Sequence, residues 1–420
     1  MIPLREARKF VLSACQPRSP DRVRLAESLG LVLAERILAS NDQPLFTNSA
    51  MDGFAVRAED TKVAPARLKV IGTIMAGQVP STTIGPGEAV RIMTGALLPE
   101  GADGVCIVEL SEIQEDGSAV VIHQPVAQGA HVRHKGEDVA SGDDVFVSRT
   151  RLTAAHIGVL SSLGLESVLV YPRLRIGVLS TGDELVGDAT MISEGKIHDA
   201  NRPALLAQLC ADGWDAVDLG QIGDDESAMT RVFAAGSAGC DALVTSGGVS
   251  KGEGDLVKVV LEKMDPAMMS MEIAVKPAKP FAFGVLPTFG TPVFGLPGNP
   301  VAALVSYELL VRPALRHMSG MLNLDRPRLR AIASEGFHRL PDGRVHFVCV
   351  RAILQPDGAI GIEKSGEQKS HVLRTLADAN ALAILPDGPG VRSGEEVEIL
   401  LLDVDRLEAM SNRGPTFNSA

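Results

Sequence analysis

The sequence contains little cysteine, few aromatic residues and no long apolar run. Its five cysteines are far apart and none stands in a CxxC pair, so the sequence predicts neither a zinc knuckle nor a disulfide framework. Aromatic residues make up 4% of the chain, against 42 glycines and 25 prolines, which predicts aliphatic cores and frequent turns. The apolar string around Cys210 predicts that this cysteine is packed in a core.

Other absences bear on location and partners. No apolar run reaches the roughly 18 residues that a transmembrane helix needs. The charged N-terminal segment lacks the apolar centre of a secretory signal, so we expect a reduced, cytoplasmic, soluble protein. Lys and Arg number 40 against 52 Asp and Glu, for a net charge of −12. That balance argues against broad binding of nucleic acid or an acidic membrane, but it leaves room for a few lysines that bind one anion.

The chain is long enough for several domains. At about 150 residues each, 420 residues predict roughly two to four domains. Leu25, Leu29 and Ile37 stand at helix-like spacing, and a second helix is predicted over 154–163. Changes in the pattern of apolar residues, glycines and prolines predict five parts. These are a discontinuous helical and linker domain (1–43 and 140–172), an inserted antiparallel β domain (44–139), an α/β domain (173–325), a C-terminal β domain (326–405) and a tail (406–420).

The α/β segment alternates short apolar strings with amphipathic stretches. The predicted strands are 174–179, 216–219, 242–245 and 292–296, and the predicted helices are 202–212, 226–235, 256–264 and 301–317. Such alternation is typical of βαβ units and a mostly parallel sheet. The predicted fold class is therefore α/β plus β.

Three loops that follow predicted strands are rich in glycine and polar groups, at 180–185, 246–255 and 296–300. Ligands of open parallel sheets bind at the carboxyl ends of the strands, where backbone amides suit a phosphate or another oxyanion. Glu184, Glu253 and Asp255 in these loops suit a divalent cation such as Mg²⁺. Alternatively, Asp255 caps the helix that follows it.

Lys276 and Lys279 each precede a proline, which stiffens the backbone. Lysine is a compact charge suited to a small anion, although two solvated surface lysines would give the same pattern. The chain has no G-x-x-x-x-G-K-[ST] and no H-E-x-x-H motif. Residues 248–252 fit the hydrolase pattern G-x-S-x-G, with Asp325 and His338 as possible triad partners. However, Ser250 lies too far beyond the predicted strand for a nucleophile elbow.

The inserted β-rich segment also contains polar residues beside glycines, in the strings 47–56, 91–96 and 135–138. Each of these strings alone is explained as a turn. Taken in order with the loops above, however, they resemble the molybdopterin molybdenumtransferase family, which comprises the MoeA proteins and the gephyrin E domain. The strings that carry the resemblance span nearly the whole chain: 48–53, 91–95, 136–138, 180–185, 199–203, 246–250, 276–280 and 296–300.

The resemblance implies a MogA-like three-layer α/β domain, flanked by an inserted β-rich domain and a C-terminal domain resembling a β-barrel. It implies an enzyme that inserts molybdate into adenylylated molybdopterin and releases AMP with the help of Mg²⁺. It also implies an elongated homodimer in which the active site lies between the α/β domain and the β-rich domain of the other subunit. An adenylyltransferase and molybdoenzyme apoproteins are the further partners implied.

Site residues follow from the same resemblance, position by position. The implied catalytic set is Asp52, Thr94, Asp138, Glu184 and Asp255, of which Glu184 and Asp255 would hold the metal. Molybdate would contact Lys276, Lys279, Arg351 and Ser370. The adenylylated pterin would contact Thr181, Gly182, Asn201, Ser246, Gly247, Gly248, Ser250, Pro297, Gly298, Asn299 and Pro300.

Two features qualify the resemblance. Lys369 and His371 stand beside Ser370 where the family often has smaller residues. Two alternatives also remain open, a non-catalytic scaffold like the anchoring role of gephyrin and the adenylyltransferase itself. A scaffold would not need the acidic residues of the catalytic set, and the adenylyltransferase resembles residues 173–320 alone.

Overall fold

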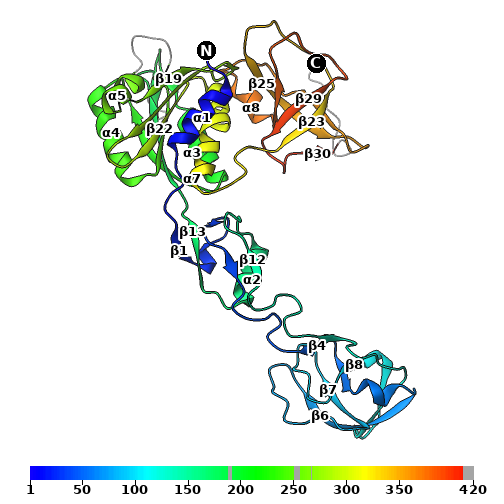
Figure 1. Cartoon of the computed structure of the whole chain (residues 1–420). Coiled ribbons are helices and arrows are strands. Elements are labelled where there is room, and N and C mark those ends of the chain that lie inside the picture. Colours follow the sequence, from blue (N-terminus) through cyan, green and yellow to red (C-terminus); the bar gives the residue numbers. More distant parts are fainter. Residues whose placement is uncertain (188–191, 250–255, 266, 410–420) are drawn as a thin grey trace. The chain divides into compact units, whose positions relative to one another are not determined.

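The computed structural model describes residues 1–187, 192–249, 256–265 and 267–409 (Figure 1). The chain divides into two compact units. The larger comprises residues 1–21, 30–32 and 171–420, and the smaller comprises 22–29 and 33–170. Each unit is described by itself.

The larger unit is built around a six-stranded sheet. The order across the sheet is β17 (Asp215–Ile222), β14 (Arg175–Thr181), β18 (Ala242–Ser246), β22 (Thr291–Leu296), β21 (Pro280–Leu286) and β19 (Met269–Glu272). The first four strands are parallel, and the last two are antiparallel to their neighbours. The central strands β14, β18 and β22 are buried almost throughout, because both faces of the sheet are covered there. The mostly parallel sheet expected from the sequence is confirmed.

Helices cover both faces of this sheet and give it three layers (Figure 1). One face packs against α1 (Leu4–Ala14), α3 (Asn201–Ala211), α6 (Pro300–Ser306) and α7 (Arg312–Met318), and the other against α4 (Glu226–Gly239) and α5 (Leu256–Met264). A π-helical turn, Tyr307–Val311, separates α6 from α7, so the predicted helix over 301–317 is interrupted. Within the described ranges, no helix has the length and apolarity needed to cross a bilayer.

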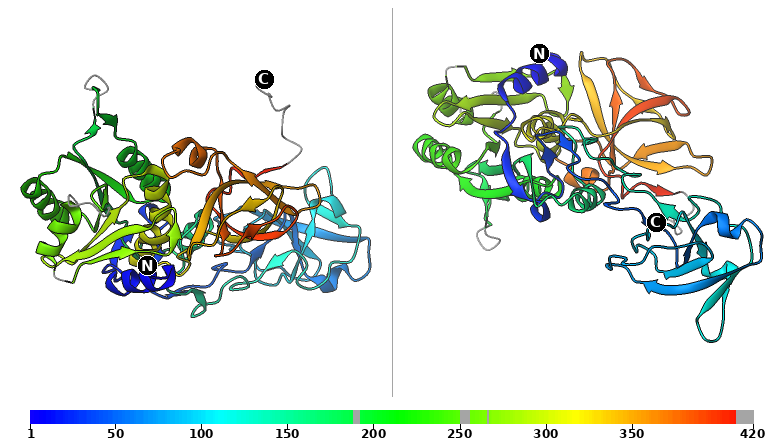
Figure 2. Two further views of the ribbon diagram at one scale, coloured as in Figure 1. Left: turned by 90° about the horizontal axis from the view of Figure 1, so that it is seen from above. Right: turned by 60° about the horizontal axis from the view of Figure 1, so that its bottom comes forward.

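The C-terminal part of the larger unit is a closed barrel of five strands. The ring runs through β25 (Val345–Leu354), β26 (Ile360–Lys364), β23 (Arg328–Ala333), β29 (Glu396–Leu401) and β27 (Ala381–Leu385), which returns to β25. Beside the ring lie β24 (Phe337–His338), β28 (Gly390–Val391), β30 (Glu408–Ala409) and α8 (Leu373–Ala377). The barrel stands next to the α/β domain in both views of Figure 2, and β20 (Val275–Lys276) pairs with β25. This confirms the expected C-terminal barrel.

The smaller unit contains a second six-stranded sheet. Its order is β8 (Gly104–Ile107), β5 (Gly53–Val56), β7 (Glu88–Ile92), β6 (Ala66–Ile74), β10 (Ala119–Ile122) and β9 (Ser111–Ile113). β6 and β7 are parallel, whereas the other pairings in the sheet are antiparallel, so the expectation of an antiparallel domain is wrong at this one pair. The connection from β6 to β7 is a long loop, 75–87, which is long enough to return the chain in the same direction.

Short elements complete the chain. They are β1 (Asp21–Arg24), β2 (Val32–Leu33), β3 (Ile37–Leu38), β4 (Asn48–Ser49), β11 (Val132–Arg133), β12 (Asp144–Phe146), α2 (Ala154–Ser162), β13 (Ser167–Tyr171), β15 (Leu185–Val186) and β16 (Ile197–His198), with 3₁₀ turns at Leu25–Glu27, Ala58–Thr61 and Val108–Leu110. The helix α2 agrees with the prediction over 154–163.

Two local predictions were wrong. The segment from Leu25 to Ile37 is a single 3₁₀ turn followed by short strands, because Leu29 is exposed and Gly30 adopts a φ of 80° that ends the turn. Cys210 is exposed rather than packed. Its neighbour on α3, Leu209, is fully buried, and Cys210 lies a helical step of about 100° further round.

Candidate active site

Three loops meet at the carboxyl edge of the parallel sheet. Strands β14, β18 and β22 are neighbours, with Ser180 opposite Ser246 and Ser246 opposite Leu296 in register. The Asn201 side-chain amide donates to Ser246 Oγ at 2.7 Å and to the carbonyl oxygen of Gly298 at 2.7 Å. One amide therefore ties two of these loops together at the first residue of α3.

The glycines of the second loop allow close approach to the first. Gly247 has a φ of 97°, and a Cβ there would lie 2.3 Å from the carbonyl oxygen of Thr181. Gly248, with a φ of 66°, also packs against the Thr181 side chain. Thr181 is 3% exposed, and its hydroxyl has no hydrogen-bond partner among the described residues. A buried, unsatisfied hydroxyl beside bare backbone is available to an oxyanion or sugar group of a ligand.

Acidic residues gather next to this edge. Asp183 Oδ1 accepts a hydrogen bond from the backbone N–H of Asp224 at 2.9 Å. The pKa of Asp224 is raised, first by burial and then by the charges of Asp183 and Glu184. The described residues include no group of three or more His, Cys, Asp or Glu side chains that is arranged to hold a metal ion. The expected positions Ser250 and Asp255 lie outside the described residues.

A pocket of about 860 Å³ opens between the α/β domain and the barrel. Pro297 and Asn299 of the third loop line it, so the pocket continues from the sheet edge, where Pro300 begins α6. Its charged lining is strongly basic: the described lining residues include one carboxylate, Asp342, against Lys276, Lys279, Arg339, Arg344, Lys364 and Lys369, with His338, His346 and His371. Such a lining favours an anionic ligand.

The two expected lysines differ in their surroundings. Lys279 is paired with Glu272 at 3.3 Å. Lys276 is exposed in the pocket, and none of the ion pairs within the described residues involves it. Ser370 also lines the pocket, and its carbonyl oxygen accepts from the backbone N–H of Val301 at 3.1 Å. The structure thus brings Lys276, Lys279 and Ser370 to one pocket.

Arg351 does not line this pocket. It lies on β25 opposite Glu363 of β26, and the two side chains form an ion pair at 2.8 Å on the barrel surface. Gln368, which the sequence analysis missed, has a clearer structural role. Its amide accepts from the Cys349 N–H at 2.9 Å and donates to the Cys349 carbonyl at 3.0 Å. It therefore fastens the loop that carries Ser370 onto the barrel.

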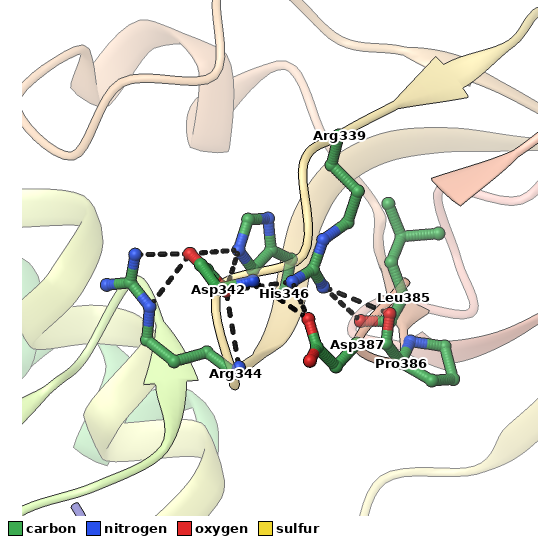
Figure 3. A network of polar contacts seen from close by, with 7 residues as sticks. All are labelled: Arg339, Asp342, Arg344, His346, Leu385, Pro386 and Asp387. Carbon is green, nitrogen blue, oxygen red and sulfur yellow. Dashed lines mark hydrogen bonds and ion pairs between the residues drawn. The ribbon is translucent and has the colours of Figure 1, made fainter. Parts of the chain in front are cut away.

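The sequence analysis also missed a polar network on the barrel wall (Figure 3). Asp342 accepts hydrogen bonds from Arg339 at 2.8 Å and from Arg344 Nε at 2.9 Å, and it lies 3.1 Å from His346 Nε2. The hydrogen bond from Arg344 is the main reason that the pKa of Asp342 lies far below its ordinary value, and the hydrogen bond with His346 lowers it further. The pKa of His346 is lowered mainly by burial, and the positive charges of Arg339 and Lys276 add to the effect against the opposing influence of Asp342.

In the smaller unit the structure joins two of the three expected catalytic residues. Asp52 Oδ1 accepts from the Thr94 N–H at 2.7 Å and from the Thr94 hydroxyl at 2.7 Å. These bonds lower the pKa of Asp52, with the backbone donor contributing most. Asp138 is exposed, and its N–H donates to the Gln43 carbonyl at 3.0 Å. Within the described ranges no hydrogen bond joins Asp138 to Asp52 or Thr94.

Comparison with known proteins agrees with these features. Three family models match the chain: the MoeA N-terminal region (domains I and II) at residues 2–164, a probable molybdopterin binding domain at 177–317 and the MoeA C-terminal region (domain IV) at 330–402. Fold and site therefore define a protein of the class that builds the molybdenum cofactor.

Individual relatives sharpen this assignment. The molybdopterin molybdenumtransferase of Haemophilus influenzae is 37% identical over 402 residues, which cover 95% of this chain and 98% of the relative. Molybdopterin molybdenumtransferase 2 of Mycobacterium tuberculosis is 36% identical over 409 residues, which cover 95% of this chain and 99% of that relative. A molybdopterin biosynthesis moeA protein of Pyrococcus horikoshii superposes with a TM-score of 0.79 at 28% identity, covering 96% of this chain and 100% of that one. The chain belongs to the molybdopterin molybdenumtransferase family.

Proposed function

We propose that this chain inserts molybdate into the dithiolene of adenylylated molybdopterin and releases AMP, assisted by Mg²⁺. The observation that carries the proposal is the basic pocket, which is continuous with the sheet-edge loops through Pro297 and Asn299. A dianion and a phosphorylated ligand could therefore bind side by side. Each of them needs positive charge or bare amides rather than a protein nucleophile.

The proposed molybdate site is Lys276 with Ser370 and Lys279. Lys276 supplies charge that no carboxylate of the described residues neutralises, and Ser370 supplies a hydroxyl donor. The phosphoanhydride of the pterin substrate would contact the loops at Gly247, Gly248 and Gly298, with the Thr181 hydroxyl as a further donor. The contribution of these residues would be positioning and electrostatic stabilisation.

The carboxylates beside β14 suit magnesium. Mg²⁺ is commonly held by one or two carboxylates, with water and substrate phosphates completing the shell, so a full protein cage is not required. The pKa of Asp224 is raised first by burial and then by the negative charges of Asp183 and Glu184, and a bound cation would relieve the contribution of those charges. Glu184, with Asp255 from outside the described residues, would hold the ion, which neutralises charge on the anhydride when bound.

We further propose that the protein works as a homodimer. Asp52, Thr94 and Asp138 of the smaller unit would complete the site of a partner subunit. The adenylyltransferase that supplies the substrate and the apoproteins that receive the cofactor are the proposed functional partners.

The decisive experiment combines purified protein with adenylylated molybdopterin, Mg²⁺ and molybdate. We expect AMP release and reconstitution of a molybdoenzyme apoprotein, both dependent on molybdate. The variant Arg330→Gln, which changes one exposed charge on the barrel surface, is the matched control and should keep full activity. AMP release at the same rate without molybdate would contradict the transferase function.

A further inference from the structure

The turn between β24 and β25 and the start of β25 place two arginines and a histidine around one carboxylate. Arg339, Arg344 and His346 all converge on Asp342 (Figure 3). The Arg344 guanidinium binds it through both Nε and Nη2, and its backbone N–H donates to Asp342 Oδ1 at 3.2 Å. A forked guanidinium together with a second cationic or neutral N–H donor is the arrangement that proteins use for phosphate and other tetrahedral oxyanions.

We propose that Arg344 and His346 form a second oxyanion seat in the basic pocket, occupied in the free protein by the Asp342 carboxylate. The ligand class is a tetrahedral dianion of the phosphate type. It would displace Asp342 and take over the donors of Arg344 and His346. This seat is separate from the proposed molybdate contacts at Ser370. The inference rests on the proposed function only in taking molybdate as the anion bound at those contacts.

The surroundings of Asp342 make the exchange feasible. Asp342 is 25% exposed on the turn, so an incoming anion can reach its oxygens. Arg339 would stay in place without it, because Arg339 also donates to Asp387 at 2.9 Å and to the carbonyls of Leu385 and Pro386 at 3.0 Å. The wall of the seat is therefore held by contacts that do not involve Asp342.

Charge and space both favour a second anion. Lys276 and His346 are register partners in the β20–β25 pair, so the seat adjoins the lysine that lacks a carboxylate partner among the described residues. Arg339 Nε is buried, the Arg339 side chain is 4% exposed, and this donor has no partner among the described residues. A volume of about 860 Å³ lies in the range of pockets for organic ligands, about 300–1,000 Å³, and exceeds what one small inorganic anion fills.

The seat is tested by binding measurements on the full-length protein without turnover. Titration calorimetry would use inorganic phosphate, phenyl phosphate and molybdate as separate probes. Asp342→Asn removes the competing charge but keeps an oxygen that can accept from the Arg344 N–H. It should tighten binding at the seat by about tenfold, whereas Arg344→Gln should abolish it. Arg330→Gln controls for a general loss of positive charge on the barrel.

A second readout follows the seat directly. Proton and nitrogen NMR of the histidine side chains should show that the pKa of His346 rises when the anion binds, because a dianion would replace the monoanion of Asp342. Binding of phosphate or phenyl phosphate with this response identifies a phosphate ligand. If molybdate is the only probe that binds, and Arg344→Gln binds one molybdate fewer per chain than the wild type, the seat is a second molybdate position. The proposal is overturned if folded Asp342→Asn binds every probe as the wild type does and the His346 resonances do not respond. Loss of transferase activity alone would leave these binding results intact.

Discussion

Lys276 and Lys279 lie three residues apart, but only Lys279 has a carboxylate partner, Glu272, within the described part of the chain. We expect Lys276→Ala to weaken molybdate binding more than tenfold, since hydrogen bonds to charged groups contribute about 1.5–3 kcal/mol. Lys279→Ala should cost only a few-fold, because Glu272 already offsets the charge of Lys279 in the wild type. Equilibrium dialysis with molybdate measures both. Binding of the pterin substrate should change less than molybdate binding in Lys276→Ala, and equal losses would contradict the assigned role.

The Asp52–Thr94 pair gives a prediction about pH. Its hydrogen bonds lower the pKa of Asp52, so the stabilisation is complete above the ordinary pKa and is lost as pH falls through the lowered value. Thr94→Val removes the hydroxyl donor and keeps the N–H, which is the larger cause. The pKa of Asp52 should therefore rise only part of the way towards its ordinary value. Carbon NMR of the carboxylate measures this, and an unchanged pKa would show that the hydroxyl bond is absent in solution.

Single side chains show where sequence analysis reached its limit. Lys276 and Ser370 were identified as site residues and share a pocket, whereas Arg351 lies elsewhere because cross-strand pairing with Glu363 holds it on the barrel surface. Arg344 and His346 were missed. Arg344 lies in the bend that precedes β25, and His346 is the second residue of that strand. Their convergence on Asp342, like that of Arg339, depends on how the turn folds and leaves no periodic signal in the sequence.

Elements were predicted best where burial is complete. The strands at 175–181, 242–246 and 291–296 match their predictions closely because parallel strands covered on both faces are apolar throughout. The prediction for 25–37 is wrong because helix-like spacing also arises by chance in short strands, and Gly30 adopts a φ of 80° that a helix does not allow. The π turn at Tyr307–Val311 changes hydrogen bonding without changing the apolar pattern, so periodicity could not reveal it.

The loop after β18 gives an element-scale prediction with a built-in control. Gly247→Ala would place a Cβ 2.3 Å from the Thr181 carbonyl at a φ of 97°, and we expect a loss of about 1–3 kcal/mol in stability with weakened pterin binding. Gly298→Ala meets nothing closer than 3.9 Å and should stay within about 0.5 kcal/mol of the wild type. Chemical denaturation compares the two. Equal stabilities would mean that the loop relaxes away from Thr181.

The segment that enters the barrel is anchored by a buried ionic network. Arg326 binds Glu308 at 2.9 and 3.0 Å and Asp212 at 3.0 Å, and both acids are less than 10% exposed. Arg326→Met should lower the unfolding free energy by up to about 3–5 kcal/mol, because it removes both hydrogen bonds to Glu308 and leaves that buried carboxylate with Arg312 at 3.9 Å. Arg328→Met breaks an exposed pair with Glu398 and should cost at most about 1 kcal/mol. Calorimetric unfolding of the two variants tests this, and similar transitions would show that the buried network contributes little.

At the scale of the whole molecule, charge is distributed unevenly. The net charge is −12, yet the pocket lining among the described residues is basic. Net charge could not locate the pocket, because the lining comes from separate parts of the sequence that meet only in the folded larger unit.

The proposed dimer allows a complementation test. If the smaller unit completes the partner's site, mixed dimers of Asp52→Ala and Lys276→Ala subunits contain one site with both defects and one site with neither. Each homodimer should be nearly inactive, and the mixture should regain activity in proportion to the fraction of mixed dimers, measured by AMP release after subunit exchange. A mixture as inactive as its components would place both residues in the site of a single chain.

The pairing of β20 with β25 has a consequence for how the pocket discriminates between ligands. Backbone hydrogen bonding in that pair fixes Val275 against Val345 and Lys276 against His346, so residues from the α/β domain and from the barrel share one short piece of sheet. A clamshell closure would have to break this sheet and then remake it. Any adjustment of this pocket to different anions is therefore limited to side-chain rotamers and to the turn at 339–344. The backbone that joins the two domains stays fixed.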